Sequence, residues 1–219
     1  MKYFIVVAFC MGLKCALSQG VGEWTWMKGD STYANDYTDM HSYGLKGTYS
    51  DSIIVPKIYG SACWSKGHRL YLLGGSTPDL ISYVSSSQNT MWKYNIDSNK
   101  WCWLKGEEFN DQSYSSFDYW GIQGIGDSIT FPIHRENSAY CTDNDGNFWL
   151  FGGYIQDDLW KYDVATNIWT WMKGPFNMSH HYGTQGVPDS LNNPPPGQFG
   201  QMWTDKQGNL WLYGGVAPS

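Results

Sequence analysis

Large aromatic side chains alternate with smaller or polar ones in two matching stretches of the chain, Met91 to Gly106 and Leu159 to Gly174. In each, a W-K-Y run is followed, after a short polar interval, by W-x-W. A period of two places alternate side chains on one face of a β-strand. The polar intervals, Asp-Ser-Asn and Ala-Thr-Asn, are typical of turns. Each stretch therefore predicts a two-stranded hairpin.

Short apolar runs that end in two glycines predict a further pair of strands before each hairpin. These runs are apolar at successive positions, as expected for strands covered by neighbouring sheets on both faces. The runs that end in two glycines are 70–75, 148–153 and 210–215. Each is preceded by a second short apolar segment, at 60–64, 138–141 and 201–203 respectively. A full repeat therefore contains four predicted strands.

The positions that recur between repeats are glycines, tryptophans and tyrosines, and we expect them to have structural roles. They are Gly74, Gly75, Trp92, Tyr94, Trp101, Gly152, Gly153, Trp160, Tyr162, Trp169, Gly214 and Gly215. A half copy of the hairpin, W-T-W-M-K-G, lies at 24–29 and predicts a lone strand over 24–27.

The double glycine, the W-K-Y strand and the later tryptophan together resemble the kelch repeat. The resemblance implies an all-β fold of propeller blades, each a four-stranded antiparallel sheet whose strands run outward from a central channel in chain order. The predicted units are a lone strand at 24–27, blades at 60–105 and 137–173, and a partial blade at 200–214. Because propellers typically close with four to eight blades, we expect an incomplete ring of about two full blades with partial blades at both ends.

An incomplete ring leaves apolar blade faces and unpaired strand edges open, and such surfaces favour association. We therefore expect either self-association or further blades supplied by a longer chain.

The first residues have the pattern of a secretory signal. A short basic start and an apolar run, 1–13, precede the small residues of Ala16-Leu-Ser18, which predicts a signal peptide at 1–18 and a mature chain at 19–219. No other stretch is long and apolar enough to span a bilayer. The protein is expected to be secreted, and the N-x-S sequence at Asn177 predicts a glycosylated asparagine.

Composition and charge narrow the possible partners. The formal net charge is −6, the pI is near 5.2 and no basic run occurs, so we expect no nucleic acid partner.

Cys63 and Cys141 lie at equal distances before a double glycine, and packing is favoured over a disulfide. The segment 143–147 resembles a calcium loop, but its counterpart at 205–209 has Lys206 at a ligand position. A hairpin turn explains both, and we expect no metal and no cofactor.

Long segments connect the blades near 30–58, 107–136 and 175–198, and each repeats a Tyr-Gly or Trp-Gly motif followed by a further glycine. Antiparallel topology places these connections at one edge of the sheets, and loops on a rigid scaffold often carry binding function. Candidate ligand-binding residues are Lys57, Arg135, Tyr43, Tyr119, Trp120, Tyr182 and Gln185.

Each candidate has a structural alternative. The aromatic residues could pack the loops onto the blade edges. Counting back from the double glycines places Lys57, Arg135 and Gly197 at equivalent positions, and Arg135 could pair with Glu136 or with a neighbouring blade instead of a ligand.

The sequence favours a secreted, non-catalytic kelch-repeat module that binds an extracellular protein or glycan through its long loops. The alternative is a fragment of a galactose-oxidase-like or other propeller enzyme. Some kelch propellers bind copper through tyrosine and histidine, but no residue context in this chain matches such a site.

Overall fold

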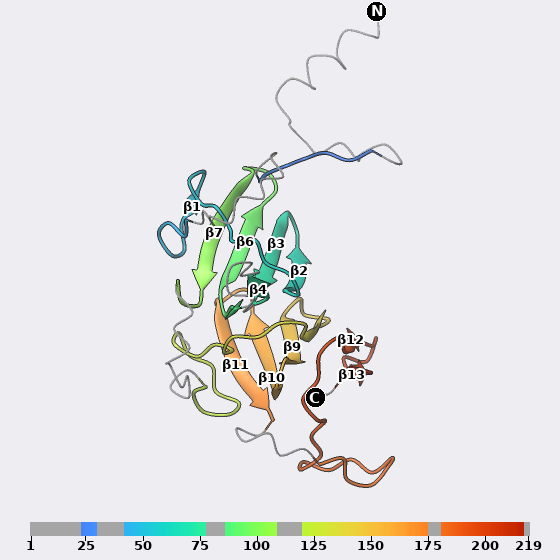
Figure 1. Cartoon of the computed structure of the whole chain (residues 1–219). Helices are drawn as coiled ribbons and strands as arrows, with labels where there is room; N and C mark the ends of the chain where they lie inside the picture. Colours follow the sequence, from blue (N-terminus) through green and yellow to red (C-terminus); the bar gives the residue numbers. More distant parts are fainter. Residues whose placement is uncertain (1–22, 30–41, 78–85, 109–119, 175–180, 217–219) are drawn as a thin grey trace, which may run out of the picture.

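A computed structural model describes residues 23–29, 42–77, 86–108, 120–174 and 181–216. These residues form antiparallel β-sheets and no helix (Figure 1). None of the described segments is therefore a helix that is long and apolar enough to cross a membrane. The all-β fold of incomplete propeller blades predicted from the sequence is confirmed.

The first full blade follows the predicted strand order. Its sheet has the order β1-β7-β6-β3-β2. Starting at the β2 edge, β2, β3, β6 and β7 therefore follow one another across the sheet in chain order. The strands are β2 (Ala62–Lys66), β3 (Arg69–Leu73), β6 (Met91–Asn95) and β7 (Lys100–Lys105), with the short β1 (Tyr49–Ser50) outside β7.

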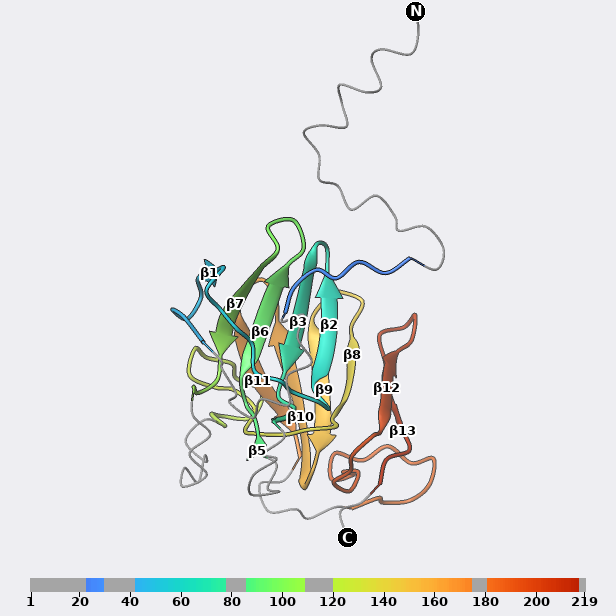
Figure 2. The same ribbon diagram turned by 45° about the horizontal axis from the view of Figure 1, so that its top comes forward.

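The second blade repeats this arrangement and lies face to face with the first (Figure 2). Its sheet has the order β11-β10-β9-β8, formed by β8 (Ala139–Thr142), β9 (Phe148–Gly153), β10 (Gln156–Asp163) and β11 (Ile168–Lys173). A third, two-stranded sheet, β12 (Gln201–Thr204) and β13 (Leu210–Tyr213), lies beside β8. It is the predicted partial blade.

The hairpins pair as the aromatic pattern requires. Trp92 faces Trp103 and Tyr94 faces Trp101 in the first blade, and the second blade pairs Trp160 with Trp171 and Tyr162 with Trp169. The turns contain asparagines in the left-handed region, Asn99 (φ 55) and Asn167 (φ 60), a conformation that asparagine tolerates.

The double glycines of the two full blades leave little room for a side chain, because neighbouring backbone lies close to them and their φ angles are positive. Gly75 has φ 93, and a Cβ there would lie 2.7 Å from the Tyr59 carbonyl oxygen. Its N–H donates to the Arg135 carbonyl of the next blade at 2.8 Å, and Gly153 donates in the same way to Gly197 at 3.0 Å. The repeated glycines thus connect consecutive blades through the main chain.

The main core lies between the two full blades. Trp64 from β2 stacks on Phe148 from β9, with ring centroids 5.1 Å apart, and donates its ring N–H to the Cys141 carbonyl at 2.9 Å. Trp160 and Trp169 are completely buried in the same cluster. Burying a large aromatic side chain stabilises a fold by roughly 2–3 kcal/mol, so this interface holds the blades together.

The Ser-rich insertion in the first blade contains a small ladder. β4 (Ser76–Thr77) pairs with β5 (Ser86–Ser87), and the Tyr59 N–H donates to the Ser76 carbonyl at 3.0 Å. The insertion therefore lies at the same end of the blade as the connection that precedes β2.

The predicted lone strand at 24–27 is wrong. These residues pair with no described strand, and Trp24 and Trp26 are exposed. In both full blades the equivalent strand pairs with a W-K-Y strand, and the described residues offer no free strand of that kind. The local geometry is nevertheless retained, because the Trp26 ring N–H donates to the Lys28 carbonyl at 3.0 Å as Trp103 does to Lys105 at 2.8 Å.

Candidate functional site

The segments that precede the blades return across the outer strands of those blades. Gly47 donates its N–H to the Trp103 carbonyl at 2.7 Å, and Gly124 donates to the Trp171 carbonyl at 2.8 Å. A single bridge pairs Asp127 with Trp169. These equivalent bonds hold each segment at the outer edge of its blade, where one side of the segment faces solvent.

Tyr43 and Trp120 are buried against the outer strands. Tyr43 is 3% exposed and its ring lies 5.1 Å from Trp92. Trp120 is 5% exposed and lies 5.6 Å from Trp160. Both rings pack a segment onto its blade, which is the structural alternative to ligand binding, so neither is available to a ligand.

The segment before the second blade exposes apolar side chains that the sequence analysis did not select. Ile122, Ile125 and Ile129, which we call the isoleucine turn, are each more than half exposed. Ile125 and Ile122 form a bridge, with the Ile125 N–H donating to the Ile122 carbonyl at 2.9 Å. The three closely spaced glycines in Gly121-Ile-Gln-Gly-Ile-Gly126 were the available signal, because such a turn has little room to bury branched side chains.

Asp127 fixes the end of the isoleucine turn. Its Oδ1 accepts the N–H groups of Ile129 and Thr130, both at 2.8 Å, and the Thr130 hydroxyl at 2.9 Å. The bonds from the Thr130 side chain and from these N–H groups lower the pKa of Asp127. The carboxylate is therefore charged at neutral pH and holds Ile129 in its exposed position.

The third segment displays the remaining loop candidates. Tyr182 is 70% exposed, and Gln185, Val187 and Leu191 are also exposed. Gln123, at the position equivalent to Gln185, donates to the Met172 carbonyl at 3.0 Å. Of the predicted loop aromatics and amides that the structure describes, only Tyr182 and Gln185 are therefore accessible.

Arg135 is a buried structural residue. It is 1% exposed, and its guanidinium binds Asp158 of its own blade with N–O distances of 2.7 and 2.8 Å. It also donates to the Gly152 carbonyl at 3.1 Å and to the Ile133 carbonyl at 3.0 Å. The prediction that Arg135 contacts a ligand is not supported, because each of its nitrogens already has a partner in the blade.

Lys57 is exposed but does not occupy the position of Arg135. Ala62 pairs with Leu73 and Ala139 with Phe151, so counting from the paired strands makes Ile58 the equivalent of Arg135. The turn between β2 and β3 is one residue shorter than its counterparts, which shifted the count from the double glycines. Tyr119 and Asn177 lie outside the described residues.

The same shift separates two cysteines. Cys63 pairs with Leu72, whereas Cys141 pairs with Trp149, so they are not at one repeat position. Cys63, Cys102 and Cys141 are free thiols. Cys63 Sγ lies 3.0 Å from the Tyr140 hydroxyl of the next blade, which agrees with a packing role.

The two calcium-like segments are hairpin turns. Asp143 Oδ1 accepts the N–H groups of Asp145 and Asn147, and its Oδ2 accepts the Trp149 ring N–H at 2.8 Å. Asp205 has the same geometry with Trp211, also at 2.8 Å. Within the described ranges, no group of three or more His, Cys, Asp and Glu side chains is arranged to hold a metal ion.

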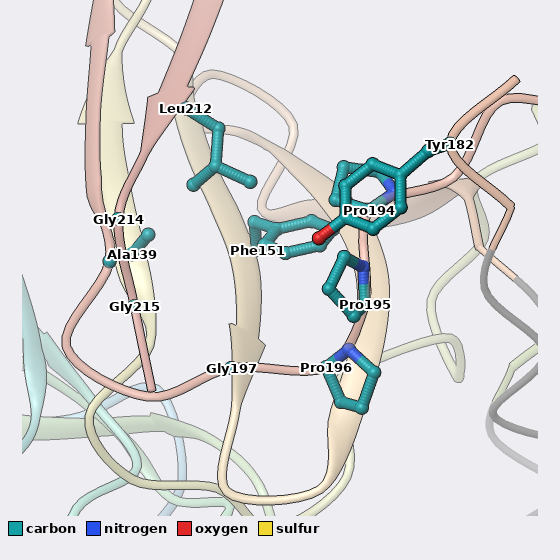
Figure 3. A pocket seen from close by; sticks show the side chains of 11 residues that line it. Ala139, Phe151, Tyr182, Pro194, Pro195, Pro196, Gly197, Leu212, Gly214 and Gly215 are labelled. Atoms are coloured by element: carbon teal, nitrogen blue, oxygen red, sulfur yellow. The ribbon is translucent and has the colours of Figure 1, made fainter. Parts of the chain in front are cut away.

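A pocket of about 410 Å³ lies between the second blade and the partial blade (Figure 3). Tyr182 and Pro194–Pro196 line one side, Leu212 lies opposite and Phe151 forms part of the wall. Side chains in this lining are apolar except for the Tyr182 hydroxyl, so the pocket is suited to an apolar or aromatic group.

Comparison with known proteins agrees with the blade geometry. No family model matches the chain. Kelch domain-containing protein 10 of Rattus norvegicus and of Homo sapiens are each 26% identical to it over 154 residues, or 68% of this chain. The protein of the same name from Xenopus tropicalis is 27% identical over the same length.

The matched region is only a part of those relatives. The chain spans 28% of the rat and frog proteins and 26% of the human protein, about a quarter of their length. The distant homology, together with four-stranded blades in which the second strand leads into a double glycine, supports a kelch-repeat family.

Proposed function

We propose that this protein is a kelch-type interaction module that binds another protein through the solvent-facing side of the segments between its blades. The observation that carries the proposal is the isoleucine turn. Branched apolar side chains held in solvent by the Gly124–Trp171 and Asp127–Thr130 bonds form a small, ordered apolar surface. Exposed apolar surface on a rigid scaffold is typical of protein-binding sites.

The same segment in the partial blade adds to this surface. Tyr182, Val187 and Leu191 are exposed there, and Tyr182 offers a rigid ring with few rotatable bonds. Protein is favoured over glycan as the ligand because the accessible residues are mainly branched and apolar.

We further propose that the partner is extracellular and that the protein is secreted. The support is the signal-like sequence at 1–18 and the sequon at Asn177. Both lie outside the described residues, so this part of the proposal rests on sequence alone.

The proposal is tested by replacing Ile122 and Ile125 together by aspartate in purified protein. Affinity capture from conditioned medium should recover a protein with the wild-type chain and lose it with this variant. A matched control is Leu70→Asp, which changes an exposed leucine on a blade face. Equal capture by all three proteins would remove the isoleucine turn from the site, and binding only to a glycan array would replace protein by carbohydrate as the ligand.

A further inference from the structure

The pocket beside β13 corresponds to a place that is filled in both full blades. Register pairs Leu72 with Trp92 and Leu150 with Trp160, and Leu212 is the equivalent of these two leucines. Trp160 belongs to one buried cluster with Ala62, Leu73, Trp120 and Leu150. The residues one repeat further along the chain are Ala139 and Phe151 of the second blade, Tyr182 of the third segment and Leu212 of the partial blade, and all four line the pocket.

The pocket therefore has the lining of a site that holds a buried tryptophan, and no described tryptophan occupies it. Trp92 and Trp160 are completely buried in the full blades, where they contact Tyr43 and Trp120 respectively. Tyr182 occupies the equivalent place but is 70% exposed. Among the described strands, none carries a tryptophan into this place.

The edge of β13 is open for such a strand. β3 pairs with β2 and β6, and β9 pairs with β8 and β10, whereas β13 pairs with β12 alone among the described strands. A strand paired on one side leaves a row of backbone N–H and C=O groups available for another. Addition of an extended peptide to a sheet edge, with side chains entering pockets, is a common recognition mode.

We propose that β13 and the Tyr182 pocket form a binding site for an extended peptide segment, with tryptophan at one position and an aromatic residue two positions later. The peptide would add antiparallel to β13, with its tryptophan opposite Leu212 and the second aromatic residue opposite Leu210. The support is the register of β6 and β10, in which Trp92 and Tyr94, and Trp160 and Tyr162, occupy these places. The two described W-K-Y strands, β6 and β10, are each paired on both sides, so neither of them is this segment.

The position two residues before the tryptophan adds a selectivity rule. In the second blade Asp158 accepts the Trp160 ring N–H at 2.6 Å and is neutralised by Arg135. In the first blade Thr90 accepts the Trp92 ring N–H at 3.1 Å, and the residue equivalent to Arg135 is Ile58. An acidic residue two positions before the tryptophan thus occurs in the blade that has arginine beside it. A threonine at that position occurs in the blade that has isoleucine instead of arginine.

The partial blade has Gly197 at the arginine position. Its carbonyl accepts the Gly153 N–H in the place where Arg135 accepts from Gly75, so the equivalence holds in space. A carboxylate buried there would have no cationic partner from this position, and burying an unpaired charge is costly. The site should therefore prefer threonine or serine over aspartate before the tryptophan.

The probe is a fluorescein-labelled peptide with the sequence of residues 88–95, Gln-Asn-Thr-Met-Trp-Lys-Tyr-Asn, and the measurement is fluorescence polarisation with the purified full chain. Binding should weaken at least about tenfold when the peptide tryptophan becomes alanine. Tyr182→Ala should weaken binding of the unchanged peptide, and Leu45→Ala is the matched control because Leu45 is similarly exposed but lies outside the pocket.

A charge exchange separates recognition from a general effect on folding. Gly197→Arg restores the residue of the second blade, and a Cβ at Gly197 meets no atom closer than 3.8 Å. The wild-type chain should bind the threonine peptide at least about tenfold tighter than its aspartate version, and Gly197→Arg should favour the aspartate version. No peptide binding, equal binding of the alanine peptide, or an unchanged preference in Gly197→Arg would overturn the proposal. A pocket closed by a second copy of the chain, seen as concentration-dependent mass without peptide binding, would also overturn it.

Discussion

Breaking the buried Arg135–Asp158 pair should destabilise the second blade more than any surface substitution. The side chains are 1% and 0% exposed, and two charged hydrogen bonds of 2.7 and 2.8 Å join them. Arg135→Ala leaves a buried carboxylate whose only remaining bond among the described residues is the one that it accepts from the Trp160 ring N–H. Removal of one partner of such a pair typically costs about 3–5 kcal/mol in the free energy of unfolding.

The chain itself supplies the compensating replacement. The first blade has Ile58 and Thr90 where the second has Arg135 and Asp158, and Thr90 still accepts the tryptophan ring N–H. The double variant Arg135→Ile with Asp158→Thr should therefore recover most of the loss from either single change. We expect a coupling of at least about 2 kcal/mol in the double-mutant cycle.

The assay is urea unfolding followed by tryptophan fluorescence, at low and at high salt. Because the pair is buried, salt should screen the coupling only weakly. A loss below about 1 kcal/mol for Arg135→Ala, as expected of an exposed pair, would refute the buried pair. Additive single and double variants would refute the coupling.

Three further predictions concern the core, the turns and the sequon. Trp169→Ala should lower the free energy of unfolding by about 3–5 kcal/mol, because Trp169 is fully buried. Trp101→Ala should lower it less, because Trp101 is only half-buried. Urea titration measures both losses. Hydrogen bonds from the Trp211 ring and from the Asn209 side-chain amide lower the pKa of Asp205 from 3.8 to about 2. The stability that this carboxylate contributes should be present above about pH 3.8 and lost as the pH falls towards 2. Carboxyl NMR titration should show a higher Asp205 pKa in Trp211→Phe. Expression in a secreting eukaryotic cell should give a glycosidase-sensitive band that Asn177→Gln abolishes, and an unshifted wild-type band would contradict glycosylation.

The blade strands were predictable because each depends on a local pattern. Period-two aromatics such as Trp92 and Tyr94, together with a double glycine, specify strand pairing within a repeat, and repetition specifies the order of the strands. The lone strand at 24–27 shows the limit of local pattern. It keeps the side-chain geometry of its counterparts but is not a strand, because a strand requires a paired neighbour.

The candidate site was harder to predict because burial depends on long-range packing. Tyr43 and Trp120 resemble exposed loop aromatics in sequence, but their segments fold back onto the outer strands of the blades. The sequence leaves open whether Arg135 binds a ligand or forms an ion pair, because its partner Asp158 is 23 residues away and lies in a different strand. The exchange of Arg135 and Asp158 for Ile58 and Thr90 was a usable signal, but only after the register of the strands corrected the repeat count.

The central claim is that consecutive blades bury matching faces and that the face after the last described strand is open. Trp64 and Tyr71 of the first blade are buried against the second, whereas their counterparts Trp203 and Trp211 are about half exposed. Light scattering coupled to size-exclusion chromatography on purified residues 19–219 tests this directly. We predict association beyond the mass of one chain that decreases when both tryptophans become serine. A stable, soluble monomer with cooperative unfolding would contradict the account.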